Sequence, residues 1–430
     1  MIVRSWTTNP RRLRQAAGDR DAIPPPRLSR VTQIMGPAFV AAIAYVDPGN
    51  VATNLTAGAT SGYLLVWVVV AASVVAMLVQ FQAAKLGMAT GKSLPRLCRE
   101  RFPRWGSRLL WVQAEIVVLA TDLAEFVGAA IGMRLLFGMP VALSAVVTAA
   151  ASLLLLELRR RGRTRRFELM SAAAVLLVGA GIGYDILVVG HQSAAGLAGG
   201  LLPTFDGHAS LVLAMGIVGA TVMPHAVYLH SALVQGRHTS ADMAWRQPSL
   251  IRRALRLDCA LALGTAAVVN VSMIALGAGL GAATAGAWDG DLLEAHAELA
   301  ARVGGGAALA FAVALLSSGV SSAGVGTLAG DIVMRGFLGR RVPVHLRRVV
   351  TMAPAVAALV CGVPLTGLLV MSQVVISLGV PVALFLLVYF CRDPAVMGPL
   401  VNAPATTRVA GVTGTVVAVL AACLPFAFLF

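Results

Sequence analysis

Apolar residues run along this chain in long segments of about 20 residues or more, the length that a helix needs to cross a bilayer. Short basic or Gly/Pro-rich breaks separate one segment from the next. The pattern predicts an all-α polytopic membrane protein with about eleven transmembrane helices. The predicted spans are residues 32–55, 63–88, 108–134, 139–157, 168–190, 209–235, 255–283, 305–330, 347–369, 371–391 and 407–430.

The first and the sixth of these spans carry a proline and polar residues near the middle, at 47–50 and 219–225. Proline lacks the backbone donor that a helix interior needs, so both helices should be broken there. Irregular backbone persists at membrane depth only where it lines a cavity or is buried in protein. Breaks at corresponding positions of two halves indicate a transporter. We therefore expect two five-helix halves, related by an inverted repeat because each half has an odd number of helices.

This repeat gives the expected domain organisation. Residues 1–30 hold seven arginines and a proline run but no apolar core, so they should form a disordered cytoplasmic arm rather than a signal peptide. Residues 31–430 should form one transporter domain. Its first repeat covers about 31–190 and its second about 208–391, and one extra helix follows at about 407–430.

Composition supports the membrane class. The chain has 430 residues, of which 58% are hydrophobic and 12% are charged, and its mean hydropathy is +0.82. A soluble core cannot hide that much apolar surface. The five cysteines are scattered without paired spacing, so neither a disulfide framework nor a zinc site is expected.

The net charge of +15 would suggest a nucleic-acid partner in a soluble protein. Here 32 of the 34 Lys and Arg residues fall in the N-terminal arm and in alternate loops, which is the positive-inside pattern. The charge therefore sets orientation, with the N-terminus cytoplasmic and the C-terminus outside, and no nucleic-acid binding is expected. An acidic stretch at 288–301 falls on the outer side and is interpreted as a solvated loop.

The two breaks carry complementary metal ligands. Asp47 offers a carboxylate oxygen, Asn50 an amide oxygen, Met223 a thioether sulfur, and Ala44 and Ala220 backbone carbonyls. Oxygen mixed with soft sulfur suits a divalent transition-metal ion better than sodium, magnesium or calcium. Two alternatives stay open: Met223 could fill a gap in the core, and Asp47 could be a structurally paired acid.

The third span holds Glu115, Asp122 and Glu125, whose offsets of seven and three place them on one helix face. Three acids are unfavourable in lipid, so this face should line a hydrated path or meet basic partners. The acids and imidazoles could form a proton relay, or only a static polar network. Candidate partners are His225, His230, Arg237, Arg347 and Arg348, of which His230 could equally be a packing residue.

Taken together, these motifs resemble the natural resistance-associated macrophage protein (Nramp) family, in its bacterial proton-coupled manganese branch. The pair of breaks carries most of the resemblance, and the stretches 84–91, 113–125 and 220–231 add to it. The resemblance extends from about residue 31 to the end of the chain. It implies a LeuT-type fold in which the first and sixth helices hold the metal.

The resemblance also implies individual roles. Asp47, Asn50 and Met223 would bind the metal through side chains, and Ala44 and Ala220 through carbonyls. The proton and gating network would include Asp47, His225, Glu125, Asp122, Glu115, Arg237, Arg347 and Arg348. Many relatives carry glutamine where this chain has Val320, Asp331 and Gly379, so Gln373 is the remaining tenth-helix amide that could reach the ion. The presence of Met223 argues against the branches of the family that transport magnesium or aluminium.

The expected function is proton-coupled uptake of divalent metal ions, mainly Mn2+ but also Fe2+, across the cell membrane by alternating access. Metal ions and protons would be substrates, with no permanent cofactor and no obligatory protein partner. The alternatives are a sodium-coupled transporter of an organic solute and a passive divalent-cation channel. An enzyme is not expected, since no nucleophile and base pair is visible.

Overall fold

The computed structural model describes residues 35–140, 143–148, 150–151, 154, 164–190, 192–235, 247–340 and 342–427. Within these residues the secondary structure is helical, without strands. Eight helices in this part are long and apolar enough to cross a membrane. The predicted arm at 1–30, and much of the predicted span at 139–157, lie outside the described residues, so the total of eleven spans stays a prediction.

The first half of the chain begins with a broken helix. Its two pieces are separated by Tyr45, Val46 and Asp47. The helices are α3 (Pro37–Ala44), α4 (Pro48–Ser61), α5 (Val66–Thr90), α6 (Leu94–Arg101), α7 (Arg104–Phe137) and α9 (Thr164–Val189).

The second half also contains a broken helix, interrupted at Val222 and Met223. Its helices are α10 (Ala194–Gly199), α11 (Gly207–Thr221), α12 (Pro224–Leu233), α14 (Pro248–Ala283), α15 (Leu292–Arg302), α16 (Gly305–Leu338), α17 (Val344–Val360), α18 (Leu365–Ser377), α19 (Val380–Cys391), α20 (Pro394–Met397), the short 3-10 helix η2 (Gly398–Leu400) and α21 (Pro404–Ala427).

Two predicted boundaries were wrong. The predicted span 347–369 ends earlier, because α17 stops at Val360 and a turn containing Gly362 and Pro364 precedes α18. The predicted span 371–391 is not one continuous helix, since Leu378 and Gly379 separate α18 from α19. A proline at 381, in the first turn of α19, fits a helix start and was the available sequence signal.

The broken helices lie at the centre of the molecule. The span containing α11 and α12 is mostly buried, whereas α9 and α21 are mostly exposed. The exposed side chains on the outer helices are largely apolar, for example Leu176 on α9 and Val412 on α21. These outer helices therefore have the surface that a lipid environment requires, and the inner helices form the core.

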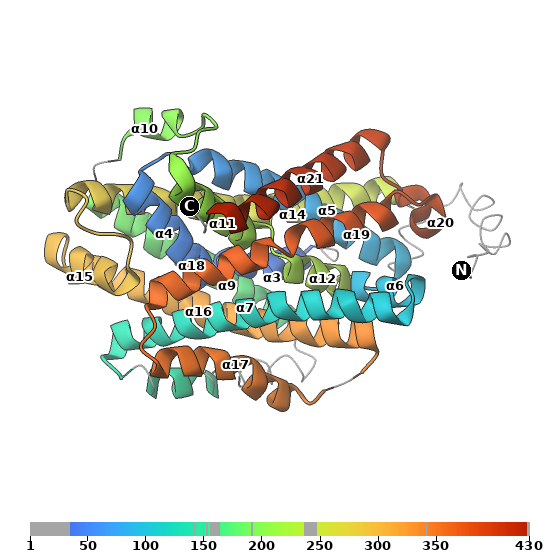
Figure 1. Cartoon of the computed structure of the whole chain (residues 1–430), viewed down its shortest axis with the longest axis horizontal. Helices are drawn as coiled ribbons and strands as arrows, with labels where there is room; N and C mark the ends of the chain where they lie inside the picture. Colours follow the sequence, from blue (N-terminus) through green and yellow to red (C-terminus); the bar gives the residue numbers. More distant parts are fainter. Residues whose placement is uncertain are drawn as a thin grey trace.

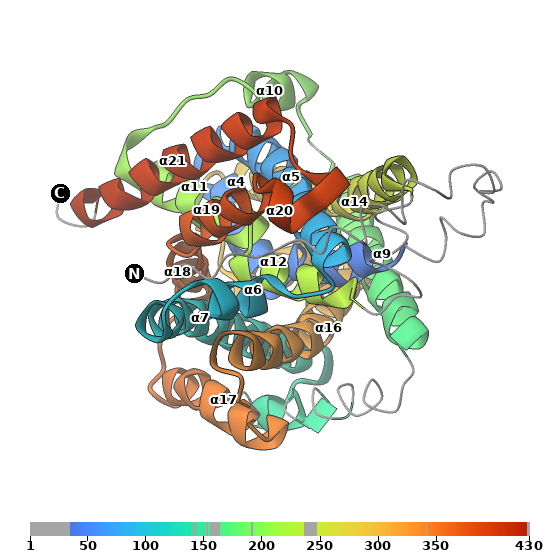
Figure 2. The ribbon, with the colours of Figure 1, turned by 90° about the vertical axis from the view of Figure 1, so that its right-hand side faces the viewer.

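Long helices run along the molecule, with α7 and α16 packed side by side (Figure 1). The connecting helices α6 and α20 lie at one end of the molecule, and α10 and α15 lie at the other. Figure 2 views the first of these ends, with α6 next to α7 and α16. This separation agrees with the predicted alternation of inner and outer loops, although which end faces the cytoplasm stays a prediction.

Candidate functional site

Each backbone break leaves one carbonyl of its helix without the N–H donor that a continuous helix would supply. In a continuous helix the N–H of residue 48 would donate to the carbonyl of Ala44, and that of residue 224 to the carbonyl of Ala220. Pro48 and Pro224 have no N–H, and each is the first residue of the second half-helix. The two carbonyls predicted as metal ligands are therefore those that the prolines deprive of their helical donors.

Asp47 caps the N-terminus of α4. Its Oδ1 accepts a hydrogen bond from the backbone N–H of Asn50 at 2.8 Å, and the residue is fully buried. Its Oδ2 is also buried and has no hydrogen-bond partner within the described residues. A buried carboxylate oxygen without a partner is a ready ligand for a cation, because a buried charge needs compensation.

Asn50 joins the two breaks directly. Its Nδ2 donates to the Ala220 carbonyl at 2.5 Å, although the two residues are 170 positions apart in sequence. Its Oδ1 accepts from Nδ2 of Asn54 at 3.3 Å, one turn further along α4. Asn54 was not singled out from the sequence, and its place one turn after Asn50 was the available signal.

Gln373 of α18 lies against both broken helices. A Cβ atom added to Gly49 would come within 1.8 Å of Gln373 Nε2, and one added to Gly219 within 1.9 Å of the Gln373 carbonyl oxygen. The Gln373 Oε1 is buried and has no hydrogen-bond partner within the described chain. The structure thus brings Gln373, which only the family resemblance suggested, to the junction of the two breaks.

This close approach gives a testable prediction for Gly49→Ala. The added methyl group cannot fit unless the Gln373 amide moves, so we expect metal uptake into proteoliposomes to fall by about tenfold or more while the protein stays folded. Gly183→Ala is the matched control, because a Cβ atom there meets open space within 4 Å. Uptake by Gly49→Ala equal to that of the control would contradict the assignment of Gln373 to the site.

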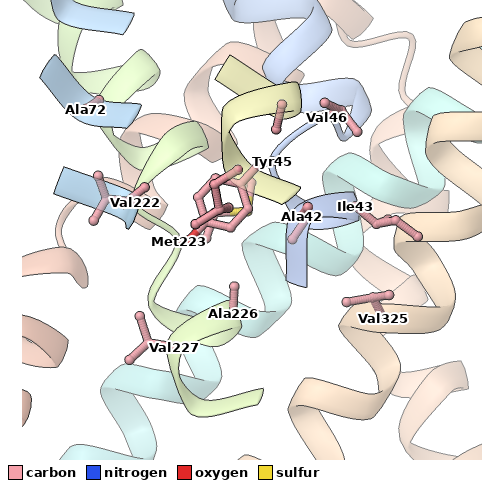
Figure 3. Close-up of a cluster of buried hydrophobic side chains, with 14 of the residues drawn as sticks. Ala42, Ile43, Tyr45, Val46, Ala72, Val222, Met223, Ala226, Val227 and Val325 are labelled. Carbon is pink, nitrogen blue, oxygen red and sulfur yellow. The ribbon is translucent and has the colours of Figure 1, made fainter. Parts of the chain in front are cut away.

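Met223 ends the second break and is fully buried. Figure 3 shows it between α11 and α12, near the apolar side chains of Val222, Ala226 and Val227. These neighbours are what a packing methionine would have, so burial alone does not separate packing from metal binding. Its role as a ligand stays a prediction.

Side chains from two other helices donate hydrogen bonds to two further backbone carbonyls of the first break. The Nδ2 of Asn270 on α14 donates to the Tyr45 carbonyl at 3.0 Å. The hydroxyl of Ser318 on α16 donates to the Val46 carbonyl at 2.5 Å. Both residues were missed from the sequence, where Asn270 is the one amide of the predicted span 255–283 and Ser318 is one of four serines at 317–322.

The acidic face of α7 begins beside the first break. A Cβ atom on Gly128 would lie 1.9 Å from the Cβ of Pro48, so the two helices touch there. One turn away, Glu125 is fully buried and neither of its carboxylate oxygens has a hydrogen-bond partner in the described structure. A line of carboxyl groups therefore leads from the break along α7.

The other two acids on this face form ion pairs with α17. Arg347 Nη2 donates to Glu115 Oε1 at 2.9 Å, and Arg348 Nη1 lies 3.4 Å from Asp122 Oδ1. Arg348 Nη1 also donates to the Thr327 hydroxyl on α16 at 2.9 Å. The two ion pairs join α7 to α17, and the hydrogen bond to Thr327 adds α16. Glu125 takes part in no ion pair within the described residues.

The two histidines of α12 have different partners. His225 Nδ1 lies 3.2 Å from the Thr121 hydroxyl of α7, which itself donates to the Val117 carbonyl at 2.9 Å. His230 Nδ1 lies 2.9 Å from Gln80 Oε1 on α5, away from the acidic face of α7.

The remaining positions noted in the sequence have varied surroundings. Arg237 lies outside the described residues. Val320 lines a separate cavity of about 320 Å³ with Ile43. Asp331 forms a partly exposed ion pair with Arg335 at 2.7 Å. A Cβ atom on Gly379 would meet Val117 Cγ2 at 2.5 Å, so a side chain larger than that of glycine has no room here without rearrangement.

The donor set at the junction is mostly neutral. Among the described residues no group of three or more His, Cys, Asp or Glu side chains could hold a metal ion. The junction instead combines one carboxylate with amides and backbone carbonyls. An ion bound there would rely on groups from both broken helices, so it would be released when those helices separate.

Two broken helices packed together at the centre of a helical membrane protein are the arrangement of the LeuT-type fold. The chain belongs to the natural resistance-associated macrophage protein-like (Nramp) family, whose sequence profile matches residues 38–427. This confirms the family resemblance inferred from the two breaks.

Similar proteins agree with the assignment. The divalent metal cation transporter MntH of Deinococcus radiodurans is 44% identical over 409 residues, covering 95% of this chain and 90% of that protein. MntH of Bacillus subtilis is 43% identical, covering 86% of each chain. The structure of the Eremococcus coleocola manganese transporter superposes with a TM-score of 0.81 at 29% identity, covering 95% and 90% of the two chains.

The expected fold is confirmed by these comparisons. The transporter Mhp1 shares the fold with a TM-score of 0.58 at 18% identity, over 91% of this chain and 92% of its own. At this identity the likeness concerns the fold alone.

Proposed function

We propose that this protein is a secondary transporter that takes up divalent transition-metal ions, Mn2+ foremost and Fe2+ as well, coupled to proton entry across the cell membrane. The observation that carries the proposal is the junction at which Asn50 bonds to the Ala220 carbonyl, together with the Oδ2 of Asp47, which has no hydrogen-bond partner among the described residues. The MntH relatives, at 43% and 44% identity, support a metal ion as substrate.

Each residue of the junction would have a distinct task. Asp47 would supply the negative charge, which replaces part of the ion's hydration. Neutral oxygen ligands would come from Asn50, Ala44, Ala220 and Gln373. Met223 would add a sulfur that favours Mn2+ and Fe2+ over Ca2+ and Mg2+. A carboxylate must be deprotonated to bind a dication, so ion binding at Asp47 would displace or relocate a proton.

The acidic face of α7 would receive that proton. Glu125 lies on α7, one helical turn from the point where this helix touches Pro48 of the first break. Its carboxylate oxygens lack hydrogen-bond partners among the described residues. Asp122 and Glu115 follow, each paired with an arginine of α17. These pairs join α7 to α17, so breaking and reforming them would accompany alternating access, with the two proposed repeats moving against each other.

Metal uptake with internal pH recorded in proteoliposomes tests the proposal, using Mn2+, Fe2+, Zn2+, Cd2+ and Mg2+. We expect Mn2+ to enter and to acidify the interior, and Mg2+ to do neither. Metal entry with no acidification would exclude proton coupling.

A sodium-coupled solute transporter is disfavoured because Asp47 would repel a substrate carboxylate. A channel is disfavoured because the two breaks form one compact site.

Glu125→Gln is predicted to separate metal transport from proton transport. The amide keeps the size of the side chain but cannot take up and release a proton, so we expect metal uptake to continue, slower, with a lower ratio of protons to metal ions. Glu100→Gln is the control, because Glu100 is an exposed residue paired with Lys92 and Arg96. An unchanged ratio in Glu125→Gln would remove Glu125 from the proton path.

A further inference from the structure

A basic cavity lies at one end of the molecule, apart from the junction. It has a volume of about 690 Å³ and lies between α6, the start of α7 and the end of α16. Arg99, Arg104, Arg108 and Arg340 line it, together with Ser107 and Trp111. Figure 2 shows these three helix ends next to one another. The transport mechanism proposed above uses none of these residues.

Within the described residues, no carboxylate neutralises the charges of this cavity. None of its four arginines forms an ion pair with a carboxylate of the described residues. Arg99 donates to the Arg335 carbonyl at 3.0 Å, which holds its guanidinium group at the cavity wall. The N-terminus of α7 adds the positive end of a 34-residue helix dipole, and its first turn holds no acidic residue. Such a concave group of cations fits a phosphate group.

The outer surface beside the cavity is apolar. Trp105, Leu109, Val112 and Ile116 of α7 are all exposed, and their spacing places them along one face of the helix. Trp105 is 72% exposed at the end of this stripe, where a tryptophan is typical of the boundary between lipid and water. Val112 also lines the cavity, so the stripe and the cavity are continuous.

We propose that this cavity binds the phosphate headgroup of an anionic phospholipid, whose acyl chains lie along the α7 stripe. Membrane orientation accounts for basic residues in this loop region, but it requires neither a cavity nor an adjoining apolar stripe. The bound headgroup would join the ends of α6, α7 and α16. Ser107 on α7 already donates to the Phe337 carbonyl on α16 at 2.8 Å, so the lipid would reinforce an existing contact.

The test compares two charge-matched double variants. Arg104→Gln with Arg108→Gln removes two cavity charges, and Arg253→Gln with Arg408→Gln removes two exposed charges elsewhere. Binding of phosphatidylglycerol to the purified protein is measured by native mass spectrometry and by the rise in Tm. We expect the cavity variant to bind about twenty-fivefold more weakly, roughly fivefold for each guanidinium group, and the control to bind like the wild type.

Separate arms identify the source of the phosphate. Phosphatidylcholine and inorganic phosphate are titrated alongside phosphatidylglycerol, and we expect neither to raise Tm as much. If inorganic phosphate alone gives the full effect, the lipid proposal is overturned in favour of a free anion. Equal loss of phosphatidylglycerol binding in both double variants would also overturn it, because the effect would then reflect net charge. Size-exclusion profiles matching the wild type establish that the variants are folded.

Discussion

Asp47→Asn is expected to abolish metal uptake and the acidification that accompanies it. The asparagine oxygen can still accept the hydrogen bond from the Asn50 N–H that caps α4, so the helix start is preserved. What the variant loses is the negative charge and the second carboxylate oxygen. We expect uptake to fall by about a hundredfold or more, since even residues that only support metal ligands contribute 10- to 100-fold to affinity.

The measurement is Mn2+ entry into proteoliposomes with internal pH recorded at the same time. Asp331→Asn serves as the control, because Asp331 is also an acid of a transmembrane helix but forms an ion pair with Arg335 away from the junction. Asp47→Ala should be equally inactive and less stable by about 1 kcal/mol, because it also loses the helix cap. Wild-type transport by Asp47→Asn would refute the site.

Met223→Ala is expected to change selectivity more than activity. The remaining oxygen ligands can still bind Mn2+, so uptake should continue at a reduced rate. Without sulfur the site loses its preference for softer ions, and we expect Ca2+ and Mg2+ to compete about tenfold better, which corresponds to roughly 1.4 kcal/mol of differential binding.

A second methionine distinguishes metal binding from packing. Met273 on α14 is also fully buried but is not among the predicted ligands, so Met273→Ala creates a similar cavity without removing a proposed sulfur ligand. Both variants should lose stability, but only Met223→Ala should admit Ca2+ or Mg2+ as competitors of Mn2+ uptake. Equal selectivity in the two variants would mean that Met223 is a core residue.

Much of the fold could be predicted because it depends on local properties of the chain. Apolar length predicted most of the spans, and Pro48 and Pro224 predicted both breaks, since a missing backbone donor acts wherever the proline lies. The interruption at Leu378 and Gly379 was missed because nothing in its apolar surroundings marked it, apart from Pro381. The end of α17 was missed although Gly362 and Pro364 mark it, because the apolar run continues on both sides of them.

The sequence by itself determined which residues could bind a metal or carry a proton, because Asp47, Met223 and the acids of α7 stand out against apolar surroundings. Only the tertiary structure decided how they meet. It placed Gln373 against Gly49, bonded Asn50 to the Ala220 carbonyl, and paired Glu115 and Asp122 with arginines while Glu125 stayed outside the described ion pairs. Residue type is a local property, whereas these contacts join positions up to 324 residues apart and depend on how the helices pack.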